Sequence, residues 1–145
     1  MISCTDFIPA YSEGFKFLEM TGGRKEVEKF WSYLSEIYLK DTLGELVSRD
    51  GLAGCYAYWS HSLNEEAADF TMILDEIKSE FIIDMHKCPS KGMLNEIKHI
   101  EPYPSYCEHC PALYAPIVEK CGYKFEYDLS LCHKANCYLR IKTDK

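Results

Sequence analysis

Basic residues are too few in this chain for a nucleic-acid surface. The 145 residues include 16 lysines and arginines against 23 aspartates and glutamates, which gives a formal net charge of −7 at pH 7. Nucleic-acid binding needs a basic stripe that neutralises phosphates, so the composition argues against a nucleic-acid partner. Long apolar runs are missing too, since no stretch approaches the roughly 18 residues of a membrane span. We expect no membrane segment.

The N-terminus lacks the basic start and apolar run of a signal peptide. We therefore expect a cytoplasmic protein, in which thiols stay reduced. In that compartment the eight cysteines favour metal binding or catalysis, with a disulfide framework as the alternative. No internal repeat or low-complexity tract is present, and 47% hydrophobic residues with 14% aromatics is a globular composition. The length predicts one domain over residues 1–145.

The hydrophobic pattern predicts an α+β fold in the order ααββααββ. The first 22 residues are expected to form an irregular lead-in. Apolar residues at three- and four-residue spacing then predict helices, and alternation predicts strands. Helices are expected over about 24–46 (disturbed near 41–44), 51–63 and 88–99, and from near 105 or 111 to 121 with a kink or restart at Pro116. Strands are expected over about 70–74, 81–85, 123–131 and 136–141. The two hairpins merge into one antiparallel sheet packed against helices, with residues 1–64 mainly helical and residues 65–145 forming a Cys/His-rich α+β part.

Six of the eight cysteines and four of the five histidines lie between His86 and Cys137. Proline follows Cys88 and Cys110, which predicts that each starts a helix, with Cys88 as an N-cap. At a helix N-terminus the macrodipole favours a thiolate, which is required of a nucleophile and of a metal ligand. His86 lies two positions before Cys88, so on a strand both side chains share a face and His86 is a candidate base or second ligand. The alternative is a capping cysteine beside a surface histidine.

Cys107 and Cys110 form a C-x-x-C motif with His109 inside it. Its late position, after a proline-rich connector, is a poor fit to a redox dithiol. As metal ligands the pair needs partners, which Cys132 and Cys137 (or His133) would supply. The candidate cofactors are zinc, manganese or an iron–sulfur cluster. Cysteines that only fill space are the remaining alternative, and we expect this role for Cys55, Cys121 and Cys4.

The last half of the chain, from about Phe81 to Ile141, resembles the family named for L-2-amino-thiazoline-4-carboxylic acid hydrolase. The resembling segments are Lys87-Cys88-Pro89, Tyr106-Cys107-Glu108, Gly122-Tyr123 and Ala135-Asn136-Cys137-Tyr138. Cys110, Cys132 and His133 are additions to the family pattern.

This resemblance implies a small-molecule substrate and hydrolytic opening of a cyclic amidine, in which a C–S or C–N bond breaks. The candidate catalytic residues are Cys88, His86, Cys107 and Cys137. In one route a metal activates the nucleophile and stabilises the leaving sulfur; in the alternative the Cys88 thiolate attacks first and His86 moves the proton. The alternative function is a non-catalytic metal- or iron–sulfur-binding sensor domain built on Cys107, Cys110, Cys132 and Cys137.

Overall fold

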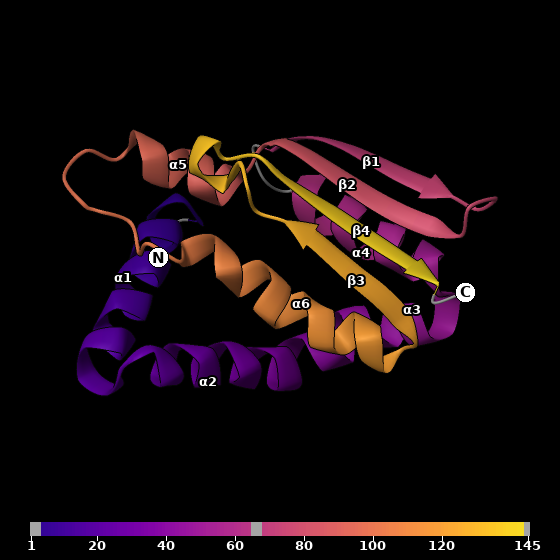
Figure 1. Ribbon diagram of the computed structural model, residues 1–145, viewed down its shortest axis with the longest axis horizontal. Helices are drawn as coiled ribbons and strands as arrows, with labels where there is room; N and C mark the ends of the chain where they lie inside the picture. Colours follow the sequence, from indigo (N-terminus) through magenta and orange to yellow (C-terminus); the bar gives the residue numbers. More distant parts are fainter. Residues whose placement is uncertain (1–3, 65–67, 144–145) are drawn as a thin grey trace.

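The computed structural model describes residues 4–64 and 68–143, and it confirms the α+β class (Figure 1). Helical segments and strands follow the predicted order, with additional short helical turns between them. The helical segments are α1 (Cys4–Gly22), α2 (Arg24–Leu34), η1 (Ser35–Gly44), α3 (Glu45–Asp50), α4 (Leu52–Asn64), α5 (Pro89–Glu96), η2 (Tyr106–Glu108), α6 (His109–Lys120) and η3 (Cys132–Lys134). The strands are β1 (Asp69–Asp75), β2 (Glu80–Lys87), β3 (Tyr123–Asp128) and β4 (Cys137–Thr143).

The strands form one antiparallel sheet in the order β1-β2-β4-β3. Each hairpin pairs internally, and the two hairpins merge into one sheet, as the sequence predicted. The pairing of β2 with β4 joins them. The third strand ends at Asp128 and not at Leu131, because the Asp128 side chain accepts the Ser130 amide hydrogen (2.8 Å) and starts a turn. The sheet therefore brings the end of β2 beside the start of β4.

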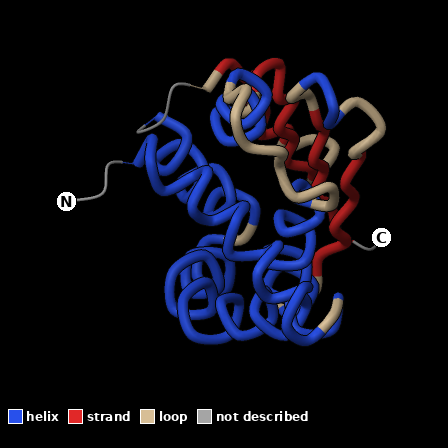
Figure 2. The backbone as a smooth tube through the Cα atoms, turned by 90° about the vertical axis from the view of Figure 1, so that its left-hand side faces the viewer, coloured by secondary structure: helices blue, strands red, loops and turns tan. Residues whose placement is uncertain are grey.

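Only one face of the sheet is packed against the helices. Along β2, Phe81, Ile83 and Met85 are buried, whereas Asp84 and His86 on the opposite face are exposed. The side view shows the helices to the left of and below the strands, so the core lies between these two layers (Figure 2). The alternation of apolar and polar residues along the strand therefore gives the sheet one face covered by helices and one open face.

The expectation of an irregular start is wrong, because residues 4–22 form helix α1. Its inward residues recur at helical spacing, with Tyr11 and Phe15 one turn apart and Phe15 fully buried. The helix ends where Gly23 adopts a positive φ of 78°, a conformation that glycine tolerates best. Packing against the rest of the chain, including α2 and α5, stabilises this helix. Polar residues interrupt its apolar stripe, so the sequence pattern did not predict it.

The expected disturbance near residues 41–44 belongs to a longer π-helical segment, η1, that joins α2 to α3. Within it, buried Ser35 donates a hydrogen bond from Oγ to the carbonyl oxygen of Leu113 in α6 (2.8 Å). Helical geometry continues to Asp50, beyond the predicted end, and Gly51 with a φ of 61° separates α3 from α4. Among the helices in residues 4–64 and 68–143, none has both the length and the apolar character needed to cross a bilayer.

Candidate functional site

The end of β2, the start of α5, the η3 turn and the start of β4 meet at one corner of the sheet. Met85 is paired with Cys137 across the β2–β4 ladder. The Cys88 amide donates to the carbonyl oxygen of Ala135 (2.7 Å), and the Asn136 side chain donates to the carbonyl oxygen of His86 (2.8 Å). These bonds hold Cys88, Cys132 and Cys137 in the same region although they are far apart in sequence.

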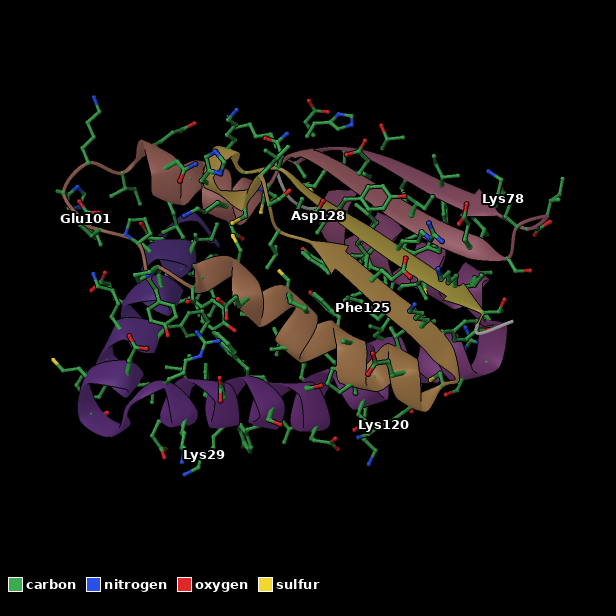
Figure 3. All side chains as sticks on the ribbon, in the orientation of Figure 1. Lys29, Lys78, Glu101, Lys120, Phe125 and Asp128 are labelled. Atoms are coloured by element: carbon green, nitrogen blue, oxygen red, sulfur yellow. The ribbon has the colours of Figure 1, made fainter. Side chains whose placement is uncertain are left out.

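The η2 turn brings Cys107 to the same corner, and the first turn of α6 brings Cys110 there. Negative charge on Cys110, Cys132 or Cys88 raises the pKa of Cys107, and the same three thiols raise the pKa of Cys137. Such mutual effects require the sulfur atoms to lie near one another. Sulfur atoms are visible between η3 and the N-terminal end of α6 (Figure 3). We call these residues, Cys88, Cys107, Cys110, Cys132 and Cys137, the thiol cluster.

Within the thiol cluster, burial is the main cause of the raised pKa values of Cys107 and Cys137. It raises the pKa of Cys107, with the neighbouring thiols adding to the effect. The pKa of Cys137 rises to about 12, also mainly through burial, although the Tyr127 hydroxyl lowers it. Both side chains are therefore protonated near neutral pH.

Cys88 caps helix α5, as the sequence predicted. Pro89 occupies the first helical position, and the Lys91 amide lies 3.5 Å from the Cys88 sulfur, to which it donates. This amide and the start of the helix favour negative charge on the sulfur. The helix ends at Glu96, before the expected end at His99, because Ile97 is already extended.

Cys110 lies beside His109 in a pair that the sequence analysis did not propose. The His109 Nδ1 faces the carbonyl oxygen of Tyr106, which can only accept, so Nδ1 carries the hydrogen. The other nitrogen, Nε2, is then an acceptor, and it lies 3.5 Å from the Cys110 sulfur. A thiol, a histidine and a group that fixes the histidine tautomer are the parts of an activated nucleophile.

Aromatic rings enclose His109. Its ring centroid lies 4.7 Å from that of Tyr106, 5.5 Å from Tyr11 and 5.8 Å from Phe15. Burial among these rings lowers the pKa of His109 to about 4, so the imidazole is neutral near pH 7. Helix α1, expected to be irregular, thus supplies a wall of the site through Tyr11 and Phe15.

Tyr127 of β3 joins the cluster from the sheet. Its hydroxyl lies 3.4 Å from the Cys137 sulfur, and it also hydrogen-bonds with Cys110. The pKa of Tyr127 is raised, first by burial and then by these thiols, so the hydroxyl keeps its hydrogen near neutral pH. The sequence signal that could have found this residue is the alternation of Phe125, Tyr127 and Leu129, which puts Tyr127 on the apolar face of its strand.

His86 lies on the open face of the sheet, with carboxylates as its neighbours. Its Nδ1 is 3.3 Å from Asp69, and its Nε2 is 3.7 Å from Asp84 and 3.3 Å from the Thr71 hydroxyl. Cys88 instead packs against the buried core. The expectation that one face carries both side chains fails because the chain leaves the strand after Lys87.

The remaining cysteines whose side chains are described lie elsewhere. Cys55 is fully buried in α4, as expected of a core residue, and Cys121 lies at the end of α6 with its sulfur 3.4 Å from the Ser48 hydroxyl. The seven cysteines from Cys55 to Cys137 are thiols. The side chain of Cys4 lies outside the described residues.

Thiolate and imidazole are suitable donors for a soft metal. Within the described residues, however, no three His, Cys, Asp or Glu side chains are arranged to hold a metal ion. The proposed set of Cys107, Cys110, Cys132 and Cys137 therefore lies together without forming a ligand shell. Side-chain rotation would have to precede any binding.

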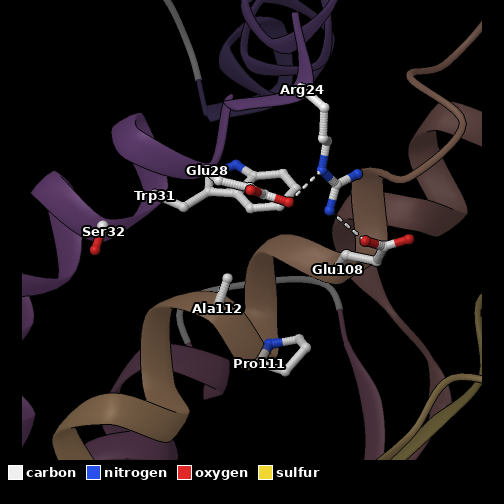
Figure 4. A pocket seen from close by; sticks show the side chains of 7 residues that line it. All are labelled: Arg24, Glu28, Trp31, Ser32, Glu108, Pro111 and Ala112. Atoms are coloured by element: carbon white, nitrogen blue, oxygen red, sulfur yellow. Dashed lines mark hydrogen bonds and ion pairs between the residues drawn. The ribbon is translucent and has the colours of Figure 1, made fainter. Parts of the chain in front are cut away.

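A hollow of about 390 Å³ lies between α2 and the first turns of α6 (Figure 4). Arg24 lies beside it, paired with Glu28 (3.0 Å) and Glu108. The Arg24 guanidinium carbon is 4.8 Å from the ring centroid of Trp31. These contacts join α2 to the turn that carries Cys107, and none of the residues that line this hollow is a cysteine.

Fold and site together define an α+β protein with a corner cluster of thiols and a buried histidine. No protein-family model, no curated protein and no solved structure matches the chain.

Proposed function

We propose that the chain is a small-molecule hydrolase whose reaction takes place at the thiol cluster. The observation that carries this proposal is the Cys110–His109 pair with its tautomer fixed by Tyr106. The resemblance of residues 81–141 to the aminothiazoline carboxylate hydrolase family supplies the substrate class, a cyclic amidine with a ring sulfur. The resembling segments contain three cysteines, and all three belong to the thiol cluster: Cys88, Cys107 and Cys137.

Cys110 is the attacking sulfur in this proposal. It lies in the first turn of α6, where the helix macrodipole favours a thiolate. Neutral His109 is placed to accept its proton at Nε2, and the Tyr127 hydroxyl donates to the sulfur. Cys88 is the second candidate nucleophile, because the Lys91 amide favours its thiolate.

The reaction has two steps. The Cys110 sulfur bonds to the amidine carbon while the C=N electron pair moves to the ring nitrogen, and the proton of the thiol passes to His109. The C=N bond then re-forms as the ring C–S bond breaks, the C–S electron pair stays on the ring sulfur, and His109 returns the proton to that sulfur. Water then adds to the same carbon, the bond to Cys110 breaks with return of the thiol, and the product is an N-carbamoyl cysteine.

Turnover of L-2-amino-thiazoline-4-carboxylate tests the proposal. We expect Cys110→Ser to lose about 10²-fold or more in kcat, because serine is far less nucleophilic than a thiolate at this pH. Mass spectrometry of the small-molecule product measures it. Cys121→Ser is the matched control, since Cys121 starts no helix and contacts Ser48.

Unchanged turnover in Cys110→Ser together with a large loss in Cys88→Ser would move the nucleophile to Cys88. Unchanged turnover in both variants, or no ring opening by the unmodified chain, would refute the hydrolase.

A second function, soft-metal binding without catalysis, is favoured by the gathering of several thiols at one corner of the sheet. Thiols release protons when a metal binds, and the cation balances the negative charge of the thiolates that form. Elemental analysis after purification without oxygen tests it. Stoichiometric zinc, manganese or iron that is lost in Cys107→Ser and kept in Cys121→Ser supports binding, and metal-free folded protein contradicts it.

A further inference from the structure

The C-x-x-C motif spans the junction of η2 and α6, and its backbone is helical throughout. The Glu108 amide donates to the carbonyl oxygen of Ser105 (3.0 Å), and the His109 amide donates to the carbonyl oxygen of Tyr106. Side chains three residues apart nearly eclipse in such a turn. The Cα atoms of residues three apart on a helix lie about 5 Å from each other, within the range of about 4.4–6.8 Å that a disulfide spans. Their Cβ atoms, about 5–6 Å apart, have to approach to about 4 Å for the bond to form.

Cys107 and Cys110 lie on a different side of this turn from the hollow. Glu108, Pro111 and Ala112 line the hollow. Among the thiols that raise the pKa of Cys107, Cys110 has the largest effect, in agreement with its position three residues along the same turn. Both side chains are only partly buried, so a small oxidant can reach them.

The position of the motif in the sequence was a poor fit to a redox dithiol, but the helical turn brings the two cysteines to one place. We propose that Cys107 and Cys110 are an oxidation site, at which a hydroperoxide converts the two thiols into a reversible disulfide. The Cys110 sulfur attacks the O–O bond, which gives a sulfenic acid and releases an alcohol or water. The Cys107 sulfur then displaces the hydroxyl group, and the S–S bond forms with loss of water. Cys110 attacks first because the start of α6 and the Tyr127 hydroxyl favour its thiolate.

The disulfide has a consequence that rests on the proposed function. Oxidation removes the attacking sulfur of Cys110, so ring opening stops until a dithiol reduces the bond. The formation of the bond itself does not depend on hydrolysis.

The sequence offers a direct readout. Cleavage after lysine gives the peptide His99–Lys120, which contains Cys107 and Cys110 and no other cysteine. The folded chain is treated with hydrogen peroxide, alkylated and digested. We expect this peptide to lose two hydrogens and to escape alkylation. Further cleavage after Glu108 then leaves two fragments that stay joined until dithiothreitol is added.

Three variants complete the test. Cys107→Ser traps the sulfenic acid on Cys110, detected by a dimedone adduct. Cys110→Ser leaves Cys107 alkylatable, and the matched control Cys121→Ser oxidises like the unmodified chain. A main product that links Cys107 or Cys110 to Cys88, Cys132 or Cys137 overturns the proposal, and so does a peptide 99–120 that stays fully alkylatable. A protein that forms the bond but opens no ring refutes only the hydrolase.

Discussion

His109 is held by different partners at its two ring nitrogens. The Tyr106 carbonyl fixes the hydrogen on Nδ1, and aromatic rings of Tyr11 and Phe15 keep water away from the ring. A protonated imidazole has no carboxylate partner among its described contacts. The same burial that makes His109 a neutral proton acceptor therefore makes its protonation costly for the folded state.

Stability should fall between pH 6.5 and pH 4 because of His109. Its pKa is about 4 in the folded chain against an ordinary value of 6.5. In this window the unfolded chain binds a proton that the folded chain does not, so acid favours unfolding. The difference corresponds to about 3 kcal/mol. Urea unfolding at pH 7 and pH 4.5 measures it.

His109→Gln should flatten this pH dependence, whereas the exposed His133→Gln should leave it unchanged. Equal slopes in all three proteins would show that carboxylates alone cause the acid sensitivity.

The sequence located the thiol cluster but not its histidine. Cys88 could be predicted as an N-cap because proline follows it, and this inference needs only the local chain. The expectation that His86 shares a face with Cys88 was wrong, because it extended strand alternation past the end of β2. The pairing of His109 with Cys110 was not predicted, because the side chains of consecutive residues on a helix rarely face each other. At the junction of η2 and α6 these two side chains do meet.

Among the elements, the sheet was easier to predict than the helices. Phe81, Ile83 and Met85 alternate with polar residues, and such a pattern can bury only one face of a strand. Helix α1 was missed because Pro9 and several polar residues interrupt its apolar stripe. The buried face of this helix is recognisable only from its packing against neighbouring elements. The π-helical segment η1 depends on packing with α6 and has no short-range signature.

Helices α3 and α4 approach each other closely at Gly54. A Cβ atom at this position would lie 2.2 Å from the carbonyl oxygen of Leu46 and 2.9 Å from the amide nitrogen of Val47. Because backbone atoms cannot yield as a flexible side chain does, Gly54→Ala should destabilise the fold by about 2–3 kcal/mol. Thermal unfolding measures it.

Gly14→Ala in α1 is the matched control. Nothing lies within 4 Å of a Cβ atom at Gly14, so alanine should stabilise the helix by up to about 1 kcal/mol. Similar effects of the two substitutions would contradict the close approach of α3 and α4.

Over the whole molecule, buried hydrogen bonds join the helical residues before 64 to the part that carries the cysteines. The Tyr103 amide donates to the Ser12 hydroxyl (2.9 Å), and Ser35 donates to Leu113 of α6 (2.8 Å). Arg24 adds a surface contact with Glu108. The thiols and the aromatic wall of the site come from opposite ends of the chain, so the site requires both parts to be folded.

Ser12→Ala should therefore destabilise the whole chain as one unit, consistent with the predicted single domain. The substitution leaves the buried Tyr103 amide without its acceptor, which costs about 1–3 kcal/mol. Fluorescence of Trp31 and Trp59 follows the helices, and hydrogen exchange at Ile83 and Leu139 follows the sheet. Both transitions should shift to lower denaturant by the same amount, because the parts share one core. Ser60→Ala, whose hydroxyl bonds within its own helix, should stay within about 0.5 kcal/mol. If only the tryptophan transition shifts, the two parts unfold independently, and the thiol cluster does not need α1 to hold its shape.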